Sequence, residues 1–295
     1  SSVAAATSGW WIAFGTDLFG FADADQALAV KALTGEFEAM PSFFERQMQG
    51  HVTQLLAMRM MMGRVAKDGI QDASGALLVD PAWIDSSLRA YRGDSQGGIM
   101  GAAYMALSTD VTRGLLGEPG MPYDLLLNRS VDWPTYGALL GSTFGSGEKG
   151  ALDVQLLLGL IQMQWDRTEP GGLAAYINQD ALPGTPSHDV LLHVAIGDHQ
   201  VSPFGAHILA REVGAKLLSA NHAAKPYPRS IWGLEPVLAP LASGSAIVEY
   251  DFGLSDPLTN LPNTEGCDPH DRVRDLTPSY EQQDEFFRSG VIDWH

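Results

Sequence analysis

The chain has 295 residues, of which 45% are hydrophobic, and this supplies enough apolar side chains for one or two globular domains. Its 35 acidic residues outnumber 18 basic ones and give a formal net charge of −17. Such an acidic chain is expected to repel nucleic acid and anionic membrane surfaces. No apolar run reaches ~18 residues, so the sequence predicts no transmembrane helix.

Residues 9–14, GWWIAF, are a short apolar run that stops at a Gly-Thr-Asp turn, which is typical of a buried strand. From about residue 23 to residue 65 the apolar spacing is helical, with breaks expected near Pro41 and at Gly50-His51. The methionines within residues 58–62 either fill the core of this helix or form an adaptable wall over an apolar substrate.

The next elements alternate between strands and helices. Residues 86–91 have strand character, residues 99–107 resume as a small-residue helix, and residues 131–186 read as a Trp-rich insertion around a helix at 152–165. The remaining expected elements are a strand at 190–196, a helix at 203–218, a strand at 246–250 and a helix at 279–288. This alternation predicts an α/β fold with a mostly parallel sheet, helices on both faces and a cap insertion.

A strand-to-helix junction carries the first chemical signal. Gly93-Asp94-Ser95-Gln96-Gly97 matches G-x-S-x-G, the pattern of a sharp turn that lifts a serine hydroxyl above the sheet. We expect both glycines to be required because a Cβ there would collide with the strand or the helix. Ser95 is therefore the predicted nucleophile, at the positive end of the following helix.

A serine nucleophile needs a base, and the base needs an orienting carboxylate. In this kind of fold the acid and then the histidine follow the serine along the chain. Asp198 comes directly after the apolar strand at 190–196 and is the predicted acid, with Asp251 as its rival. His270 follows the last strand by a loop and is the predicted base. The other histidines after Asp198 are placed less well for this role: His199, His207, His222 and His295.

Three stretches, at 91–107, 191–202 and 267–275, resemble the nucleophile, acid and histidine segments of the α/β-hydrolase superfamily. They are similar to large secreted bacterial esterase- and lipase-like hydrolases, in which RSVDWPTY, IQMQWDRTEP and GDHQV are also expected. The resemblance spans residues 9–295. It implies that residues 1–295 form the C-terminal portion of one catalytic domain, with cap elements at 23–80 and 131–186. It also implies a secreted, periplasmic or cell-surface location.

The resemblance also implies two backbone N–H groups that hold an oxyanion, one from Gln96 and one from a loop after an earlier strand. No motif for that loop precedes Ser95, so the early strands are expected on a second polypeptide made by cleavage of a common precursor. Cys267 is the only cysteine. It either bridges to that partner by a disulfide or remains a free thiol.

The sequence therefore predicts a serine hydrolase that cleaves carboxylic esters through an acyl-enzyme, without a cofactor or metal ion. Amide or peptide hydrolysis by the same triad is the alternative within enzymes, and an inactive binding or scaffold protein is the alternative outside them. Trp133, Tyr136 and Phe144 are the predicted lining of an apolar substrate pocket.

Overall fold

The computed structural model describes residues 11–145, 147–219, 230–257 and 259–294. Its centre is a six-stranded sheet in the order β3-β4-β5-β8-β6-β7, and every neighbouring pair is parallel. The strands are β3 (Tyr91–Asp94), β4 (Arg113–Gly117), β5 (Asp189–Ala195), β6 (Lys216–Ser219), β7 (Pro236–Leu238) and β8 (Ala246–Tyr250). The predicted α/β architecture with a mostly parallel sheet is confirmed.

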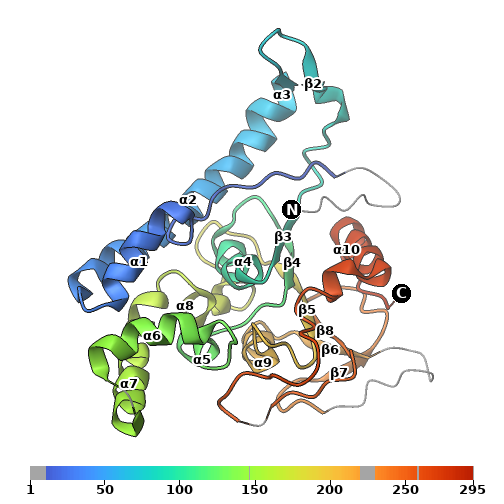
Figure 1. The fold of residues 1–295 in the computed structure, drawn as a ribbon. Helices are drawn as coiled ribbons and strands as arrows, with labels where there is room; N and C mark the ends of the chain where they lie inside the picture. The colour runs from blue at the N-terminus through green and yellow to red at the C-terminus, as the bar shows by residue number, and fades with distance from the viewer. Residues whose placement is uncertain (1–10, 146, 220–229, 258, 295) are drawn as a thin grey trace.

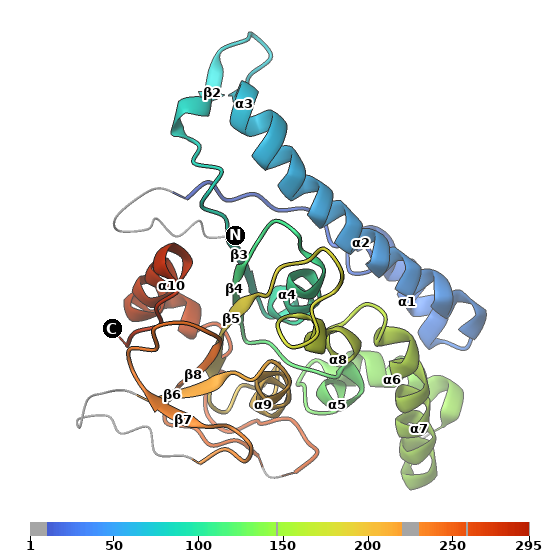
Figure 2. The same cartoon turned by 180° about the vertical axis from the view of Figure 1, so that it is seen from behind.

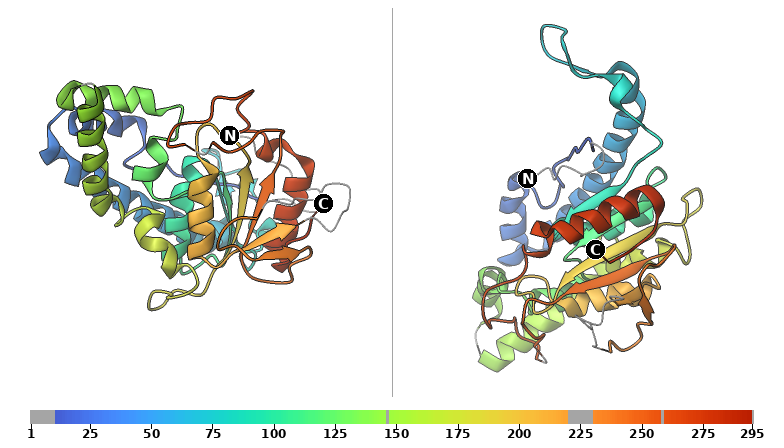
Figure 3. Two further views of the ribbon diagram at one scale, coloured as in Figure 1. Left: turned by 90° about the horizontal axis from the view of Figure 1, so that it is seen from below. Right: turned by 90° about the vertical axis from the view of Figure 1, so that its right-hand side faces the viewer.

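Helices cover both faces of this sheet (Figure 3). On one face lie α4 (Gln96–Leu107) and α9 (Pro203–Glu212), whose apolar side chains share a core with Leu116 and Leu192. On the other face α10 (Thr277–Ser289) packs Phe286 and Phe287 against Leu115. Neighbouring strand residues thus point to opposite cores, which explains why the central strands are apolar along their whole length.

The remaining helices form two segments outside the sheet (Figure 1). The first contains α1 (Gln26–Leu33), α2 (Met40–Met60), a π-helical turn (Met61–Val65) and α3 (Ala66–Asp68). The second contains α5 (Tyr123–Leu127), α6 (Trp133–Phe144), α7 (Gly147–Trp165) and α8 (Pro170–Leu173). Short 3₁₀ turns occur at Asp23–Asp25, Phe37–Ala39, Pro81–Trp83, Ala174–Tyr176 and Val273–Asp275.

A two-stranded hairpin, β1 (Ile70–Gln71) with β2 (Leu77–Val79), stands at the far end of α2, away from the main sheet (Figure 2). The helix α2 runs without a break through Gly50-His51, so the interruption expected there is wrong. Gly50 lies inside the helix, where the backbone of Phe19 packs so closely that a Cβ would press against it. Pro41 stands in the first turn, where no hydrogen-bond donor is needed.

The expected buried strand at 9–14 is wrong for the residues that the structure describes there. Residues 11–14 have no regular secondary structure, and Ile12 and Phe14 are 40% and 42% exposed. Within the described part of the chain they pair with no strand, and Trp11 packs its ring on Phe287. Apolar composition without a pairing partner does not make a strand.

Two further boundaries differ from expectation. The strand predicted at 86–91 begins at Tyr91 and continues to Asp94, and the helix predicted at 203–218 ends at Glu212. The strand β6 occupies the last part of that range. Within the described residues β3 and β7 are the two edge strands of the sheet. A second polypeptide with further strands stays a prediction.

Candidate active site

Ser95 occupies the turn between β3 and α4. Its backbone has φ 58° and ψ −120°, in a region that non-glycine residues rarely adopt and that costs roughly 1–3 kcal/mol. Its N–H donates a hydrogen bond to the carbonyl oxygen of Gly117 at 2.8 Å, which ties the turn to β4. The fold therefore holds this one serine in a strained conformation at the N-terminus of a helix.

The glycines around this turn do not all have the role that the sequence predicts. At Gly93 a Cβ would overlap the carbonyl oxygen of Gly97, as expected. At Gly97 a Cβ would meet only the Tyr91 hydroxyl, at 3.9 Å, so the predicted collision there is wrong. The crowded helix position is Gly98 instead, where a Cβ would overlap the carbonyl oxygen of Gly117. Close packing of α4 on β4 requires that glycine.

This difference predicts opposite outcomes for two neighbouring substitutions. Gly98→Ala is expected to lower the free energy of unfolding by about 3 kcal/mol, because two backbone segments must move apart. Gly97→Ala is expected to change it by less than about 1 kcal/mol, since alanine is the better helix former. Urea denaturation of both variants measures this. Equal destabilisation by the two would contradict the packing described here.

Ser95, His270 and Asp198 form a continuous chain of hydrogen bonds. The Ser95 hydroxyl lies 2.8 Å from His270 Nε2, and His270 Nδ1 lies 2.8 Å from Asp198 Oδ2. His270 and Asp198 are 3% and 2% exposed. With the ring proton on Nδ1 facing the carboxylate, Nε2 is free to accept the serine proton. The contacts predicted from sequence for these three residues are present.

The loop that carries Asp198 is held in place by its own backbone. The second carboxylate oxygen, Oδ1, accepts hydrogen bonds from the N–H groups of Gln200 and Val201 at 2.8 and 2.9 Å. Asp268 then joins this loop to the histidine loop, because its Oδ1 accepts from the N–H groups of His199 and His270. Asp198 and His270 therefore lie on two loops that Asp268 links by hydrogen bonds.

The rival acid, Asp251, lies elsewhere. It is exposed at the end of β8, and its carboxylate accepts a hydrogen bond from the Gly253 N–H at 2.7 Å. Among the other histidines, His199 contacts the Glu265 carbonyl and His207 pairs with Glu249 at 2.7 Å. His222 and His295 lie outside the described residues. Of the two candidate aspartates, Asp198 is the one that contacts His270.

Two opposing effects act on the His270 ring. Burial lowers its pKa, and the hydrogen bond and negative charge of Asp198 raise it. The net result is a pKa above the usual value for histidine. The surroundings thus favour the protonated form of the His270 ring.

Glu118 is a buried acid next to these three residues that the sequence did not predict. It follows β4 directly, has φ 45°, and accepts a hydrogen bond from Arg274 Nη2 at 2.9 Å. The same Nη2 lies 3.5 Å from the His270 carbonyl oxygen. The pair therefore ties the histidine loop to the end of β4. An acid directly after the apolar stretch GLLG was the available signal.

Burial raises the pKa of Glu118 to about 8, against the nearby charge of Arg274. Because the folded chain binds this proton more tightly than the unfolded chain, the protein loses stability as pH rises from about 4.5 to about 8. Glu118→Gln has no proton to lose. It is expected to be more stable than wild type at pH 9, by on the order of a few kcal/mol, and to lose this advantage at pH 4.

Urea denaturation at both pH values measures this difference. Glu281→Gln, at an exposed position on α10, is the matched control and should give no pH-dependent difference. A Glu118→Gln advantage that is absent at pH 9, or that is equal at both pH values, would count against a proton held on Glu118 in the folded protein.

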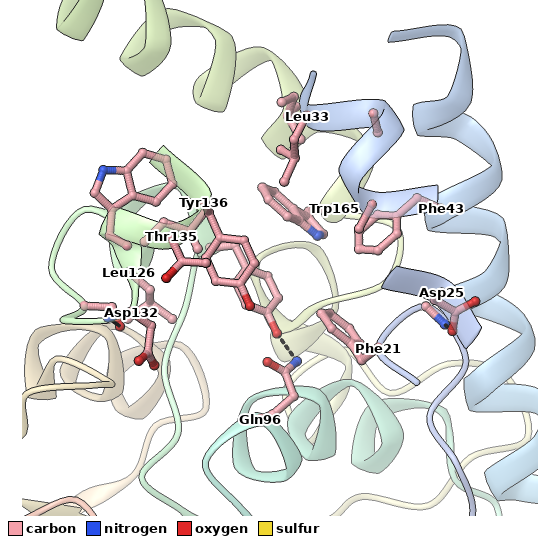
Figure 4. A pocket seen from close by; sticks show the side chains of 18 of the residues that line it. Phe21, Asp25, Leu33, Phe43, Gln96, Leu126, Asp132, Thr135, Tyr136 and Trp165 are labelled. Carbon is pink, nitrogen blue, oxygen red and sulfur yellow. Dashed lines mark hydrogen bonds between the residues drawn. The ribbon is translucent and has the colours of Figure 1, made fainter. Parts of the chain in front are cut away.

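A cavity of about 530 Å³ opens beside Ser95, with Ser95 and Gln96 in its wall. Gln96 begins α4, so its backbone N–H has no acceptor in the preceding helical turn. Its side chain donates from Nε2 to the Tyr123 hydroxyl, and Figure 4 shows it pointing from the start of α4 toward the aromatic side chains above. The volume is in the range of small-molecule sites.

Both outer segments contribute to this cavity, the first through residues 20–44 and the second through residues 123–165. Trp133 and Tyr136 line it, as the sequence predicts. Phe144 does not belong to its lining: it stands at the end of α6 and packs on Phe37, with ring centroids 5.9 Å apart. The methionines of 58–62 are also absent from the lining, and Met58 is buried in the core between α4 and the sheet.

Other kinds of site find little support in the part of the chain that the structure describes. There, no three His, Cys, Asp or Glu side chains are grouped so as to hold a metal ion. None of the helices described combines the length and the hydropathy needed to cross a bilayer. Cys267 is exposed and unpaired within the chain. Comparison with models of known families, with curated proteins and with solved structures found no match.

Proposed function

We propose that this protein is a serine hydrolase that cleaves carboxylic esters, with the α/β-hydrolase fold. The observation that carries the proposal is the pair of 2.8 Å hydrogen bonds that link Ser95 to His270 and His270 to Asp198. The strained turn at Ser95, between a parallel strand and a helix, supports it. So does the cavity that reaches the serine.

In the proposed reaction the Ser95 oxygen attacks the ester carbonyl while its proton passes to His270 Nε2. Asp198 keeps the ring oriented and stabilises its positive charge. The Gln96 N–H, at the positive end of α4, donates to the oxyanion of the tetrahedral intermediate. His270 then protonates the leaving alcohol, and the acyl group remains on Ser95. Water attacks this acyl-enzyme with the same base and releases the acid.

A fluorophosphonate probe tests the proposal without knowledge of the substrate. The serine oxygen displaces fluoride from phosphorus, so a nucleophilic Ser95 is expected to take up one probe per chain. Intact mass spectrometry measures the adduct, and peptide mapping locates it. A folded protein that stays unlabelled at Ser95, in the presence of any partner chain, would favour the inactive scaffold instead.

The leaving group separates the two enzyme alternatives. Esters and anilides with the same acyl group can be compared by kcat/KM on the same sample. Turnover of the esters alone supports the proposal. Turnover of anilides at a comparable rate would point to an amidase or peptidase with the same three residues.

A further inference from the structure

Five aromatic side chains in the cavity wall form a closed circuit of ring contacts. Going round, the centroid distances are 5.9 Å for Phe21–Phe43, 5.5 Å for Phe43–Phe44 and 5.6 Å for Phe44–Trp165. They continue with 5.1 Å for Trp165–Tyr123 and 6.2 Å for Tyr123–Phe21. All five rings line the cavity. Three of the five contacts are edge-to-face, an arrangement that fixes each ring against the next.

The circuit lies close to the proposed chemistry. Tyr123, one of its members, accepts the hydrogen bond from the Gln96 side chain, and Gln96 is next to Ser95 in the chain. Figure 4 shows Phe21, Phe43 and Trp165 together with Gln96 around this part of the cavity. A substrate whose carbonyl is at Ser95 would therefore place a neighbouring group against these rings.

The charges in the wall narrow the chemistry of that group. Among the described residues of the lining, Asp25 and Asp132 are the charged ones, so no cation is available there to hold an anionic group. Asp25 is 2% exposed and is already satisfied by Arg46 and by the N–H groups of Gly20 and Ala22. It therefore offers no free carboxylate to a cationic group. Asp132 is exposed to solvent, and Figure 4 shows it on the far side of Gln96 from Phe21 and Phe43. The part of the cavity beside the rings therefore favours an uncharged group.

The rigidity of the aromatic wall further limits which uncharged group can bind there. A planar ring gains edge-to-face or offset-stacked contacts with fixed aromatic neighbours, and each such pair adds affinity beyond its buried area. A linear chain of equal carbon number has no such contacts and loses rotational freedom when it is ordered. Within the proposed esterase function, we infer that the substrate is an ester that carries an uncharged aromatic ring next to the scissile bond.

Two matched ester pairs test this inference on the wild-type enzyme. Benzyl acetate against heptyl acetate varies the alcohol side, and methyl phenylacetate against methyl octanoate varies the acyl side. Proton release measured in a pH-stat gives kcat/KM without a chromophore that is itself aromatic. For at least one pair the ring-bearing ester is expected to be preferred about three- to tenfold. Linear esters that equal or exceed their ring partners in both pairs would overturn the inference, as would a choline ester or a hemisuccinate ester as the best substrate.

Substitution of one ring tests the circuit itself. Phe43→Leu keeps apolar volume but removes the ring that links Phe21 to Phe44, so the preference ratio is expected to fall about threefold or more. Phe21→Leu provides a second test if the first variant folds poorly. Phe14→Leu is the control, because Phe14 is exposed and outside the lining, and its ratio should match wild type. An unchanged ratio in both circuit variants would contradict the inference.

A binding measurement separates this inference from the proposed activity. Ser95→Ala can be titrated with benzyl methyl ketone and with 2-nonanone while tryptophan fluorescence is recorded, and neither ketone needs turnover. Tighter binding of the ring ketone, with no hydrolysis of any ester by wild type, would support the aromatic site and reject the esterase. Ester turnover by wild type with equal binding of the two ketones would support the esterase and reject the aromatic site.

Discussion

Ser95→Ala is expected to lower kcat for any ester substrate by about ten-thousandfold or more, because the covalent route is lost altogether. The fold should survive, since alanine keeps the Cβ and the backbone bond from residue 95 to Gly117. The variant should also take up no fluorophosphonate. Initial rates, mass spectrometry and circular dichroism on one preparation measure all three effects.

Ser289→Ala is the matched control for this experiment. Ser289 is exposed at the end of α10, and its hydroxyl donates to the Glu285 carbonyl oxygen at 2.8 Å. Wild-type rates and wild-type labelling are expected for it. If Ser95→Ala keeps more than a few per cent of the wild-type rate, a different nucleophile performs the reaction.

Asp198→Asn carries the second large expected effect, a loss in kcat of about ten-thousandfold. An amide at this position presents either a neutral oxygen or an N–H to His270 Nδ1. It then fails to stabilise the imidazolium or favours the wrong ring tautomer. The two N–H groups of Gln200 and Val201 still find an acceptor in the amide oxygen, so the loop should keep its shape.

Asp251→Asn is the natural comparison, because Asp251 was the rival acid on sequence grounds and lies exposed on another loop. Its kcat is expected to stay within about twofold of wild type. Measurement of both variants against one ester decides between the two carboxylates. A larger loss for Asp251→Asn than for Asp198→Asn would overturn the assignment of the acid.

The central strands were predictable because both of their faces are buried. The run AIVEY at 246–250 and the run at 190–196 correspond to β8 and β5 within one residue, since a continuous apolar stretch is what a two-sided core demands. The same rule fails at 9–14, where the apolar residues find no strand to pair with in the described structure. Local composition predicts burial, but pairing depends on the rest of the sheet.

The three hydrogen-bonded residues at the candidate active site could also be predicted, since each follows a strand or a late loop in a recognisable order. The pair of Glu118 and Arg274 was not predicted. Only the place of Glu118 directly after an apolar strand pointed to it, and no motif marks Arg274 as its partner. The aromatic circuit could not be predicted from the sequence either. Its rings come from a loop, from α2, from α5 and from α7, and no short pattern links them.

The proposed reacting residues and most of the cavity wall come from different parts of the chain, and this affects which substitutions the protein can accumulate. The residues proposed for bond cleavage stand on loops at the ends of β3, β5 and β8, whereas most of the cavity wall comes from residues 20–44 and 123–165. Substitutions in these two segments can alter which molecule fits without disturbing proton transfer. Descendants of one gene are therefore expected to accept different substrates while they keep the contacts among Ser95, His270 and Asp198.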